Sequence, residues 1–134
     1  MDPAVTLHVR DELADAELEA LHATAFGHDP GGTPWRRRLA DHSLTWVTAR
    51  HDGRLVGFVN VVGDGGVHAF LLDTCVAPDV RGCGVGRALV AAAVEQARAA
   101  GCHWVHADDE PHLVAFYEDA CGLRPTAAGV VRLV

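Results

Sequence analysis

Residues 76–86 read Val-Ala-Pro-Asp-Val-Arg-Gly-Cys-Gly-Val-Gly, and this is the most informative stretch of the chain. An apolar run from Phe70 to Val76 stops at Pro78, and the helix-forming sequence Ala-Leu-Val-Ala-Ala-Ala follows at 88–93. Glycines in such a strand-to-helix turn let backbone N–H groups approach a bulky ligand, and the helix N-terminus adds a positive partial charge. The stretch therefore predicts a cradle for the phosphates of a cofactor.

The spacing of the glycines narrows the choice of cofactor. The nucleoside triphosphate loop requires Gly-Lys-Ser/Thr at its end, and this chain contains no lysine. The dinucleotide fingerprint requires Gly-x-Gly-x-x-Gly, whereas here Arg81 precedes Gly82-x-Gly84-x-Gly86. The pattern that remains is Arg81-x-x-Gly84-x-Gly86. A tight turn whose glycines serve only close packing is the alternative interpretation.

The composition fits one compact α/β domain that spans residues 1–134. With 134 residues, of which 49% are hydrophobic, the chain can bury a core. No apolar run approaches the ~20 residues of a bilayer-spanning helix, and the first residues lack the pattern of a signal peptide. We therefore expect a cytoplasmic protein with no membrane partner. The net charge of −7 argues against a nucleic-acid partner and favours a cationic one.

The cysteines and histidines do not form a metal-binding pattern. There is no Cys-x-x-Cys pair, so we interpret the four cysteines as reduced thiols: Cys75, Cys83, Cys102 and Cys121. The densest histidine cluster is His103-x-x-His106, but these positions face opposite sides of a strand, which is poor geometry for two ligands. We therefore expect no metal.

Strand and helix signals alternate along the chain. Strands are predicted at 5–9, 44–49, 55–62, 70–76 and 104–107, with one or two short strands after Leu123. Helices are predicted from a cap at Asp11 to Gly27, at 35–39, at 87–100 and at 111–121. The alternation, without repeats or linkers, predicts a single α/β domain.

Two motifs in this order resemble those of the GNAT acyltransferases. The loop that starts at Arg81 is similar to the family's coenzyme A pyrophosphate loop, Gln/Arg-x-x-Gly-x-Gly/Ala, and Phe116-Tyr117 with Gly122-Leu123 is similar to its Phe-Tyr and Gly-Phe motif. The resemblance implies an α/β (α+β) fold with a mixed, mostly antiparallel sheet and about four flanking helices. It implies an N-acetyltransferase that passes the acetyl group of acetyl-CoA to a primary amine in a ternary complex. A homodimer stays open.

The resemblance also assigns a cofactor site residue by residue. Thr74, Cys75 and Val76 at the strand end would pair their backbone with the pantetheine arm. The loop would bind the pyrophosphate through its backbone N–H groups, and its residues are Arg81, Gly82, Cys83, Gly84, Val85 and Gly86. The N–H near Val76 would polarise the thioester carbonyl, and Tyr117 would protonate the leaving thiolate. Tyr117 also belongs to an apolar helical stripe, so inward packing is its alternative role.

The identity of the general base is left open by the sequence. Phe70 stands where some GNAT relatives carry a glutamate, so neighbouring residues become candidates. Asp73 lies on the same strand, and alternation places its side chain on the face opposite that of Phe70. His68 shares the face of Phe70 and could act through water at neutral pH. Asp108 and Asp109 could also serve, with a solvated or capping role as the alternative, and a water chain without a dedicated base is a further option.

The acceptor groove is expected between the first two helices and the turn at 63–66. The residues that we expect to contact the substrate or to lie near it are Phe26, His28, Asp29, Trp35 and Phe70. The acceptor would be a small-molecule or peptide amine, in line with the acidic balance of the chain.

Two other functions remain open at this point. Phe70 in place of the glutamate, and Glu110 in place of a cofactor-contacting asparagine of many relatives, would suit a non-catalytic acyl-CoA sensor with the same fold. A module whose loop binds a different phosphate ligand is the second alternative.

Overall fold

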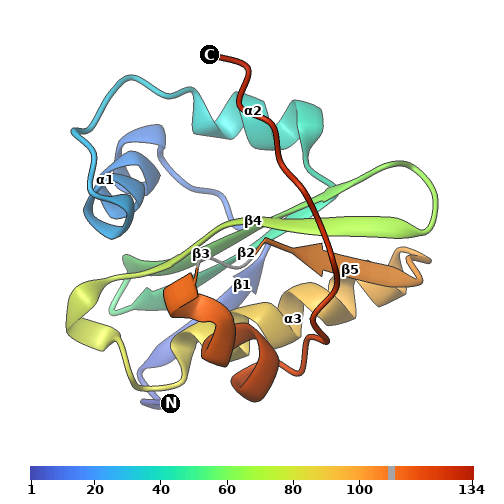
Figure 1. Ribbon diagram of the computed structural model, residues 1–134. Helices are drawn as coiled ribbons and strands as arrows, with labels where there is room; N and C mark the ends of the chain where they lie inside the picture. The colour runs from blue at the N-terminus through green and yellow to red at the C-terminus, as the bar shows by residue number, and fades with distance from the viewer. Residues whose placement is uncertain (109–110) are drawn as a thin grey trace.

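The computed structural model of the chain describes residues 1–108 and 111–134. At its centre is a five-stranded sheet with the strand order β1-β2-β3-β4-β5 (Figure 1). The strands are β1 (Val5–Val9), β2 (Thr45–His51), β3 (Arg54–Gly63), β4 (His68–Val76) and β5 (Trp104–Ala107). Strands β1 to β4 pair antiparallel with their neighbours, and β5 runs parallel to β4. The prediction of a mixed, mostly antiparallel sheet is confirmed.

Helices cover both faces of the sheet. The α-helices are α1 (Asp15–Phe26), α2 (Trp35–His42) and α3 (Val85–Ala99). Figure 1 shows α1 and α2 on one face and α3 on the other. A 3-10 turn, η1 (Pro78–Val80), follows β4. The helix predicted for 111–121 is present as one helical run over 111–120, which starts with the 3-10 turn η2 (Pro111–Leu113) and ends with the π-helical η3 (Phe116–Ala120). None of the helices in the described ranges has the length and apolarity needed to cross a membrane.

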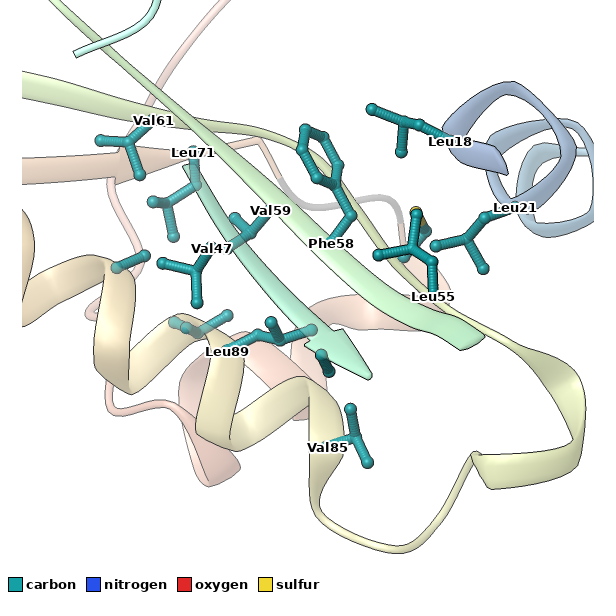
Figure 2. Packing of buried hydrophobic residues seen from close by; sticks show 14 of the residues in the cluster. Leu18, Leu21, Val47, Leu55, Phe58, Val59, Val61, Leu71, Val85 and Leu89 are labelled. Atoms are coloured by element: carbon teal, nitrogen blue, oxygen red, sulfur yellow. The ribbon is translucent and has the colours of Figure 1, made fainter. Parts of the chain in front are cut away.

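Alternation along the central strands builds an apolar layer on each face. Val47 and Val59 point toward α3, where they meet Leu89, and Figure 2 shows these side chains between the sheet and the helix. On the other face, Phe58 lies toward Leu18 of α1. All five side chains are fully buried, and each contributes about 1.5–3 kcal/mol relative to an exposed position. The two layers fix the sheet between its helices.

The last residues of the chain differ from the prediction. Residues 123–134 form no strand. They run as an extended tail from the α3 side of the sheet past β5 toward α2, and Val130, Val131 and Leu133 are exposed (Figure 1). The predicted strands are wrong here because β-branched residues favour a strand only where a neighbouring strand offers a ladder and a packed face.

Asp11 binds an arginine of the sheet and does not cap α1 as predicted. The N-cap of α1 is Ala14, whose N–H donates to Glu17 at 2.8 Å. Arg50 of β2 donates to Asp11 at 2.7 Å and to Glu17 at 2.9 Å, and the hydroxyl of Thr48 donates to Asp11 at 2.8 Å. The hydrogen bonds from Arg50 lower the pKa of Glu17, because they favour the ionised carboxylate more than partial burial disfavours it. This network ties the start of α1 to the sheet.

Replacing the cation of this network is expected to destabilise the fold. Arg50→Leu leaves two half-buried carboxylates without their partner, so the free energy of unfolding at pH 7 should fall by about 2–4 kcal/mol, less than for a fully buried pair because solvent screens part of the interaction. The matched control Arg98→Leu removes an exposed pair with Glu95 and should change stability by less than about 1 kcal/mol. Urea unfolding of both variants measures the difference, and equal stabilities would contradict this role of Arg50.

The effect of Arg50→Leu is also expected to depend on pH. Glu17 contributes to the free energy of unfolding above the ordinary glutamate pKa of about 4.3, because its pKa is lowered in the folded state. It is lost as the pH falls through that lowered pKa. The stability curves of the wild type and Arg50→Leu should therefore converge in acid.

Candidate functional site

Strands β4 and β5 separate halfway along β4 and leave a bare strand edge. Their parallel pairing runs from His68 opposite Trp104 to Leu71 opposite Ala107, where β5 ends. The remaining residues of β4, 72–76, pair only with β3 on their other side. Within the described residues, no strand covers this edge. An extended ligand could bind there by adding to the sheet as a strand does.

A β-bulge lies where the two strands part. The register of β4 shifts between Phe58 and Asn60 of β3, so one β3 residue stands opposite both Asp73 and Thr74. Asp73 has a φ of 59°, a conformation that costs a residue other than glycine roughly 1–3 kcal/mol. The extra residue turns the side chain of Asp73 toward α1, onto the face that carries Phe70. The prediction that Asp73 faces the opposite side is wrong, because a bulge interrupts strand alternation.

The bare edge of β4 carries polar groups that a ligand can bind. Ala77 donates its N–H to the carbonyl of Val56 at 2.8 Å, so alternation in the antiparallel ladder directs the backbone groups of Val76 away from β3. The carbonyl of Val76 accepts a hydrogen bond from Arg81 Nε at 3.0 Å. The Oγ1 atom of Thr74 is buried and has no hydrogen-bond partner among the described residues. Such an orphaned hydroxyl is unfavourable, and a ligand on this edge would supply its partner.

The predicted phosphate loop follows directly beyond this edge. Gly82 and Gly84 have φ values of 76° and 85°, which residues with a Cβ atom rarely adopt. Gly84 is the N-cap of α3, and no side chain caps the helix, so its first backbone N–H groups remain open to a ligand. Arg81 and Arg87 are exposed beside them. Backbone donors, a helix N-terminus and two cations are the groups with which proteins commonly bind anions.

Gly86 serves a different purpose from the other two loop glycines. A Cβ atom at this position would lie 3.2 Å from Cζ of Phe116, so Gly86 allows the ring to approach the first turn of α3. Phe116 in turn packs against Tyr117 with ring centroids 4.9 Å apart. Tyr117 is buried, and it lies in η3. The two sequence motifs, separated by about thirty residues, therefore meet at the start of α3.

The α1/α2 face of β4 and β5 presents an exposed aromatic surface. Phe70 stacks on His106 with ring centroids 4.6 Å apart, and His68 Nδ1 lies 2.9 Å from His106 Nε2. Phe70, Leu72 and Trp104 are 41%, 44% and 54% exposed. His68 and Phe70 share one face, as predicted. This surface lies next to the bulge and can receive the apolar part of a ligand.

His22 is the residue at this site that the sequence reasoning missed. Its Nε2 lies 3.0 Å from Asp73 Oδ1, and its Nδ1 lies 2.7 Å from Nε2 of His28. Its ring packs beside Phe26 and Trp35, at centroid distances of 4.4 and 5.1 Å. The two predicted acceptor-site aromatics thus converge on His22. The available signal was helical spacing, because His22 precedes Phe26 by four residues.

The two aromatic residues differ in their access to a substrate. Phe26 is exposed at the end of α1, whereas Trp35 is buried against Phe58. The indole Nε1 of Trp35 donates to Glu19 at 3.0 Å, and the same carboxylate accepts the N–H of Gly31 at 2.6 Å. These hydrogen bonds lower the pKa of Glu19, the one from Gly31 most strongly. Trp35 therefore holds the α1–α2 loop in place, and Phe26 is the one open to solvent.

The other predicted candidates form no hydrogen bond with Asp73 or lie outside the described residues. Asp108 is exposed beyond β5, and Asp109 and Glu110 are not among the described residues. All four cysteines are free thiols. Burial raises the pKa of the Cys75 thiol to about 12, with the charge of Asp73 adding to the effect. Within the described ranges, no group of His, Cys, Asp and Glu side chains is arranged to hold a metal ion.

These features define an α/β protein whose sheet splits at one edge, beside a glycine-rich loop and an uncapped helix N-terminus. The chain belongs to the Acetyltransferase (GNAT) family, whose profile matches residues 9–123. The family expected from the two motifs is therefore confirmed, and the match extends well beyond both motifs.

The relatives agree with this assignment. The chain is 42% identical over 106 residues to mycothiol acetyltransferase of Nocardia farcinica, a match that covers 77% of this chain and 35% of the relative. It is 34% identical over 85 residues to a chloroplastic serotonin N-acetyltransferase of rice (Oryza sativa subsp. japonica), covering 60% of this chain and 42% of that protein. The chain thus spans less than half the length of these two relatives.

The fold recurs in solved structures. An aminoglycoside acetyltransferase from an uncultured soil metagenomic sample superposes with a TM-score of 0.82 at 14% identity, over 99% of this chain and 98% of the other. At this identity the likeness establishes the shared fold.

The contact between Gly86 and Phe116 can be tested by filling the space between them. Gly86→Val should destabilise the protein by roughly 1–3 kcal/mol, because the added methyl groups collide with the ring. The double variant Gly86→Val/Phe116→Ala should be less destabilised than the sum of the two single changes. Thermal unfolding of all four proteins gives the coupling energy, and strictly additive effects would contradict the contact.

Proposed function

We propose that this protein transfers an acetyl group from acetyl-CoA to a primary amine by direct attack in a ternary complex. The observation that carries the proposal is the convergence of the bare β4 edge, the loop 81–86 and the Phe116–Tyr117 segment at one place. The matched relatives are named acetyltransferases, which supports the same class of reaction. Acetyl-CoA would supply the reactive thioester.

The residues fit the separate parts of this co-substrate. The β4 edge at 74–76 would pair with the amide groups of the pantetheine arm, and the orphaned Thr74 hydroxyl would gain a partner. The loop residues Arg81, Gly82, Cys83, Gly84, Val85 and Gly86 would surround the pyrophosphate. Recognition through backbone N–H groups leaves side chains free to vary, which suits the exposed Cys83 in this loop. Arg81 and Arg87 would add positive charge.

Two groups are proposed to stabilise the negative charges that develop on the thioester oxygen and on the leaving thiolate. The outward backbone N–H of Val76 would donate to the thioester oxygen as negative charge develops on it. Tyr117 would protonate the departing thiolate, and its burial in η3 beside Phe116 supports a fixed position for that hydroxyl.

Direct transfer is favoured over an acyl-enzyme on Cys75. The thiolate is the nucleophilic form of cysteine, and burial raises the pKa of this thiol to about 12. At neutral pH Cys75 therefore stays protonated and unreactive. The amine itself is left as the nucleophile.

The acceptor that suits the exposed surface is a small amine with an apolar or aromatic body. Phe70 and Leu72 border the bulge on the acceptor side and would contact that body, with Phe26 at the end of α1 nearby. One relative is named for serotonin, an aromatic primary amine, and this fits a stacking surface such as Phe70 on His106. The net charge of −7 favours a cationic acceptor in general, and a peptide amine is the other class to be tested.

The cofactor loop provides a direct test with a matched control. Gly84 and Gly101 lie at opposite ends of α3, both with positive φ (85° and 90°). Gly84→Ala and Gly101→Ala should each cost about 1 kcal/mol of stability through backbone strain. Only Gly84→Ala should also weaken acetyl-CoA binding, by about tenfold, since it distorts the backbone donors of the loop. Calorimetric titration decides, and equal affinities for the two variants would contradict the role of the loop.

The overall activity is tested by release of coenzyme A thiol from acetyl-CoA across a panel of aromatic amines, amino sugars and peptides. We expect turnover with aromatic amines first. Tight acetyl-CoA binding without turnover on any amine would favour the acyl-CoA sensor. An absence of binding would contradict the proposal altogether.

The role of Tyr117 is tested by removing its hydroxyl. Tyr117→Phe keeps the ring and its packing, so we expect acetyl-CoA affinity close to that of the wild type. Loss of the proton donor should lower kcat by about 100-fold. Steady-state kinetics measured across pH give the result, and a wild-type rate at every pH would exclude Tyr117 as the acid.

A further inference from the structure

An arginine of the cofactor loop covers one point of the bare β4 edge. Arg81 donates from Nε to the backbone carbonyl of Val76 at 3.0 Å. Ala77 directs its own N–H inward, to the carbonyl of Val56, so the carbonyl of Val76 points outward, away from β3. The guanidinium therefore lies where an extended ligand added to this edge would place an N–H donor.

The charge of Arg81 also acts on the end of this strand. Burial raises the pKa of the Cys75 thiol to about 12, the charge of Asp73 adds to that effect, and the charge of Arg81 opposes it. Coulombic influence falls with distance, so this effect agrees with a guanidinium beside β4 rather than one extended into solvent. The hydrogen bond and the electrostatics therefore indicate the same position.

The partner that Arg81 has here is weaker than the one that a phosphate would give it. Val76 offers a neutral carbonyl oxygen, and within the described ranges the arginine, which is exposed, has no carboxylate partner. A guanidinium binds phosphate more strongly, because both groups are charged and two parallel N–H groups can donate at once. Arg81 is therefore expected to exchange the carbonyl for a phosphate within its reach.

The groups expected to bind phosphate begin one residue beyond Arg81. Gly82 and Gly84 have φ values of 76° and 85°, and Gly84 precedes α3 without a side-chain cap. Arg81 thus lies between the β4 edge, which is expected to bind the pantetheine arm, and the loop, which is expected to bind the pyrophosphate. While its Nε holds the Val76 carbonyl, a ligand amide cannot take that position.

We propose that Arg81 is a latch, a side chain that covers the β4 edge until a phosphate binds it, and that this latch selects phosphate-bearing thioesters over thioesters of the pantetheine arm alone. The proposal deepens, and rests on, the acetyl transfer proposed above. A thioester with a pyrophosphate offers the guanidinium a stronger partner than Val76, so the edge opens as the ligand binds. A thioester without phosphate must displace the guanidinium into water and gives it no charged partner in exchange.

The strength of one hydrogen bond sets the size of this selection. A net hydrogen bond of ordinary strength corresponds to about two- to tenfold in affinity. The exposure of Arg81 places its bond to Val76 toward the lower end, at about threefold. A charge-assisted contact with phosphate is about twice as strong, which corresponds to about tenfold. Removing the side chain should therefore change the affinities for the two kinds of thioester in opposite directions.

Two substitutions of Arg81 separate the latch from the charge. Arg81→Ala removes both, so the affinity for acetyl-CoA should fall by about tenfold, while the affinity for acetyl-pantetheine, which carries no phosphate, should rise by about threefold. Arg81→Gln loses the charge but keeps an N–H donor, as many bonds from Cα as the arginine Nε. It should lose the same affinity for acetyl-CoA and gain none for acetyl-pantetheine. Calorimetric titration measures the first affinity, and competition with acetyl-CoA measures the second.

Arg87 supplies the matched control for these variants. It is the second exposed cation beside the loop, and within the described ranges its side chain holds no carbonyl of β4. Arg87→Ala should weaken the binding of acetyl-CoA, because a positive charge near the pyrophosphate is lost. It should leave the affinity for acetyl-pantetheine unchanged, since no hydrogen bond at the strand edge is removed.

The outcomes distinguish failure of the latch from failure of the proposed function. If Arg81→Ala binds acetyl-pantetheine no more tightly than the wild type does, the latch is overturned and the acetyl transfer stands. The same holds if Arg81→Gln gains as much affinity for acetyl-pantetheine as Arg81→Ala, because loss of the charge would then be sufficient. A wild type that binds neither thioester would overturn the proposed function, and the latch with it.

Proton exchange at the arginine side chains gives a readout that depends on neither activity nor affinity. In ¹H–¹⁵N spectra of the protein without ligand, the Nε proton of Arg81 should exchange with water more slowly than that of Arg87, because the carbonyl of Val76 accepts it. Addition of acetyl-CoA should shift the Arg81 signal, since its Nε changes partner. Exchange at Arg81 as fast as at Arg87 would overturn the latch.

Discussion

The bulge at Asp73 is the constraint on which the rest of the site depends. One extra residue in β4 bends the strand away from β5, so pairing stops at Leu71 and the edge beyond it stays open. The same residue adopts a left-handed conformation and is held there by His22 of α1. Removing the extra residue would restore strand alternation and turn the Asp73 carboxylate away from α1. The bulge therefore lies between the open β4 edge and the Asp73 side chain, at a cost of roughly 1–3 kcal/mol of backbone strain.

The open edge of β4 leads directly to a loop whose backbone is held rigidly in place. The loop 81–86 is short, its left-handed glycines leave one backbone path, and α3 behind it is anchored by Val85 and Leu89 in the core. Phe116 closes the frame from the other side by seating on Gly86. Backbone donors held in this way need no rearrangement when an anion binds, which is the condition for strong electrostatic recognition.

The sequence predicted the order and type of most elements because their signals are local. Hairpin turns, the Gly27 helix end and the apolar periods of β3 and α3 each depend on neighbouring residues. Three features were mispredicted because distant partners decide them. Asp11 binds Arg50 across the sheet instead of capping α1, the tail finds no ladder, and Asp73 changes face through a bulge whose register is set by β3. The helix at 111–121 was placed correctly, but its π-helical geometry left no sequence signal.

This difference between local signals and distant partners also applies to the candidate site. The sequence indicates the cofactor loop more clearly than it indicates the acceptor side. A ligand bound by backbone N–H groups constrains the glycines that permit the backbone path, and these stand next to one another in the chain. The polar side chains beside the expected acceptor surface come instead from several elements: His22 on α1, His28 in a loop and Asp73 on β4. Their separation of up to 51 residues carries no periodic or motif signal. Only the packing of α1 against the bulge brings them into contact.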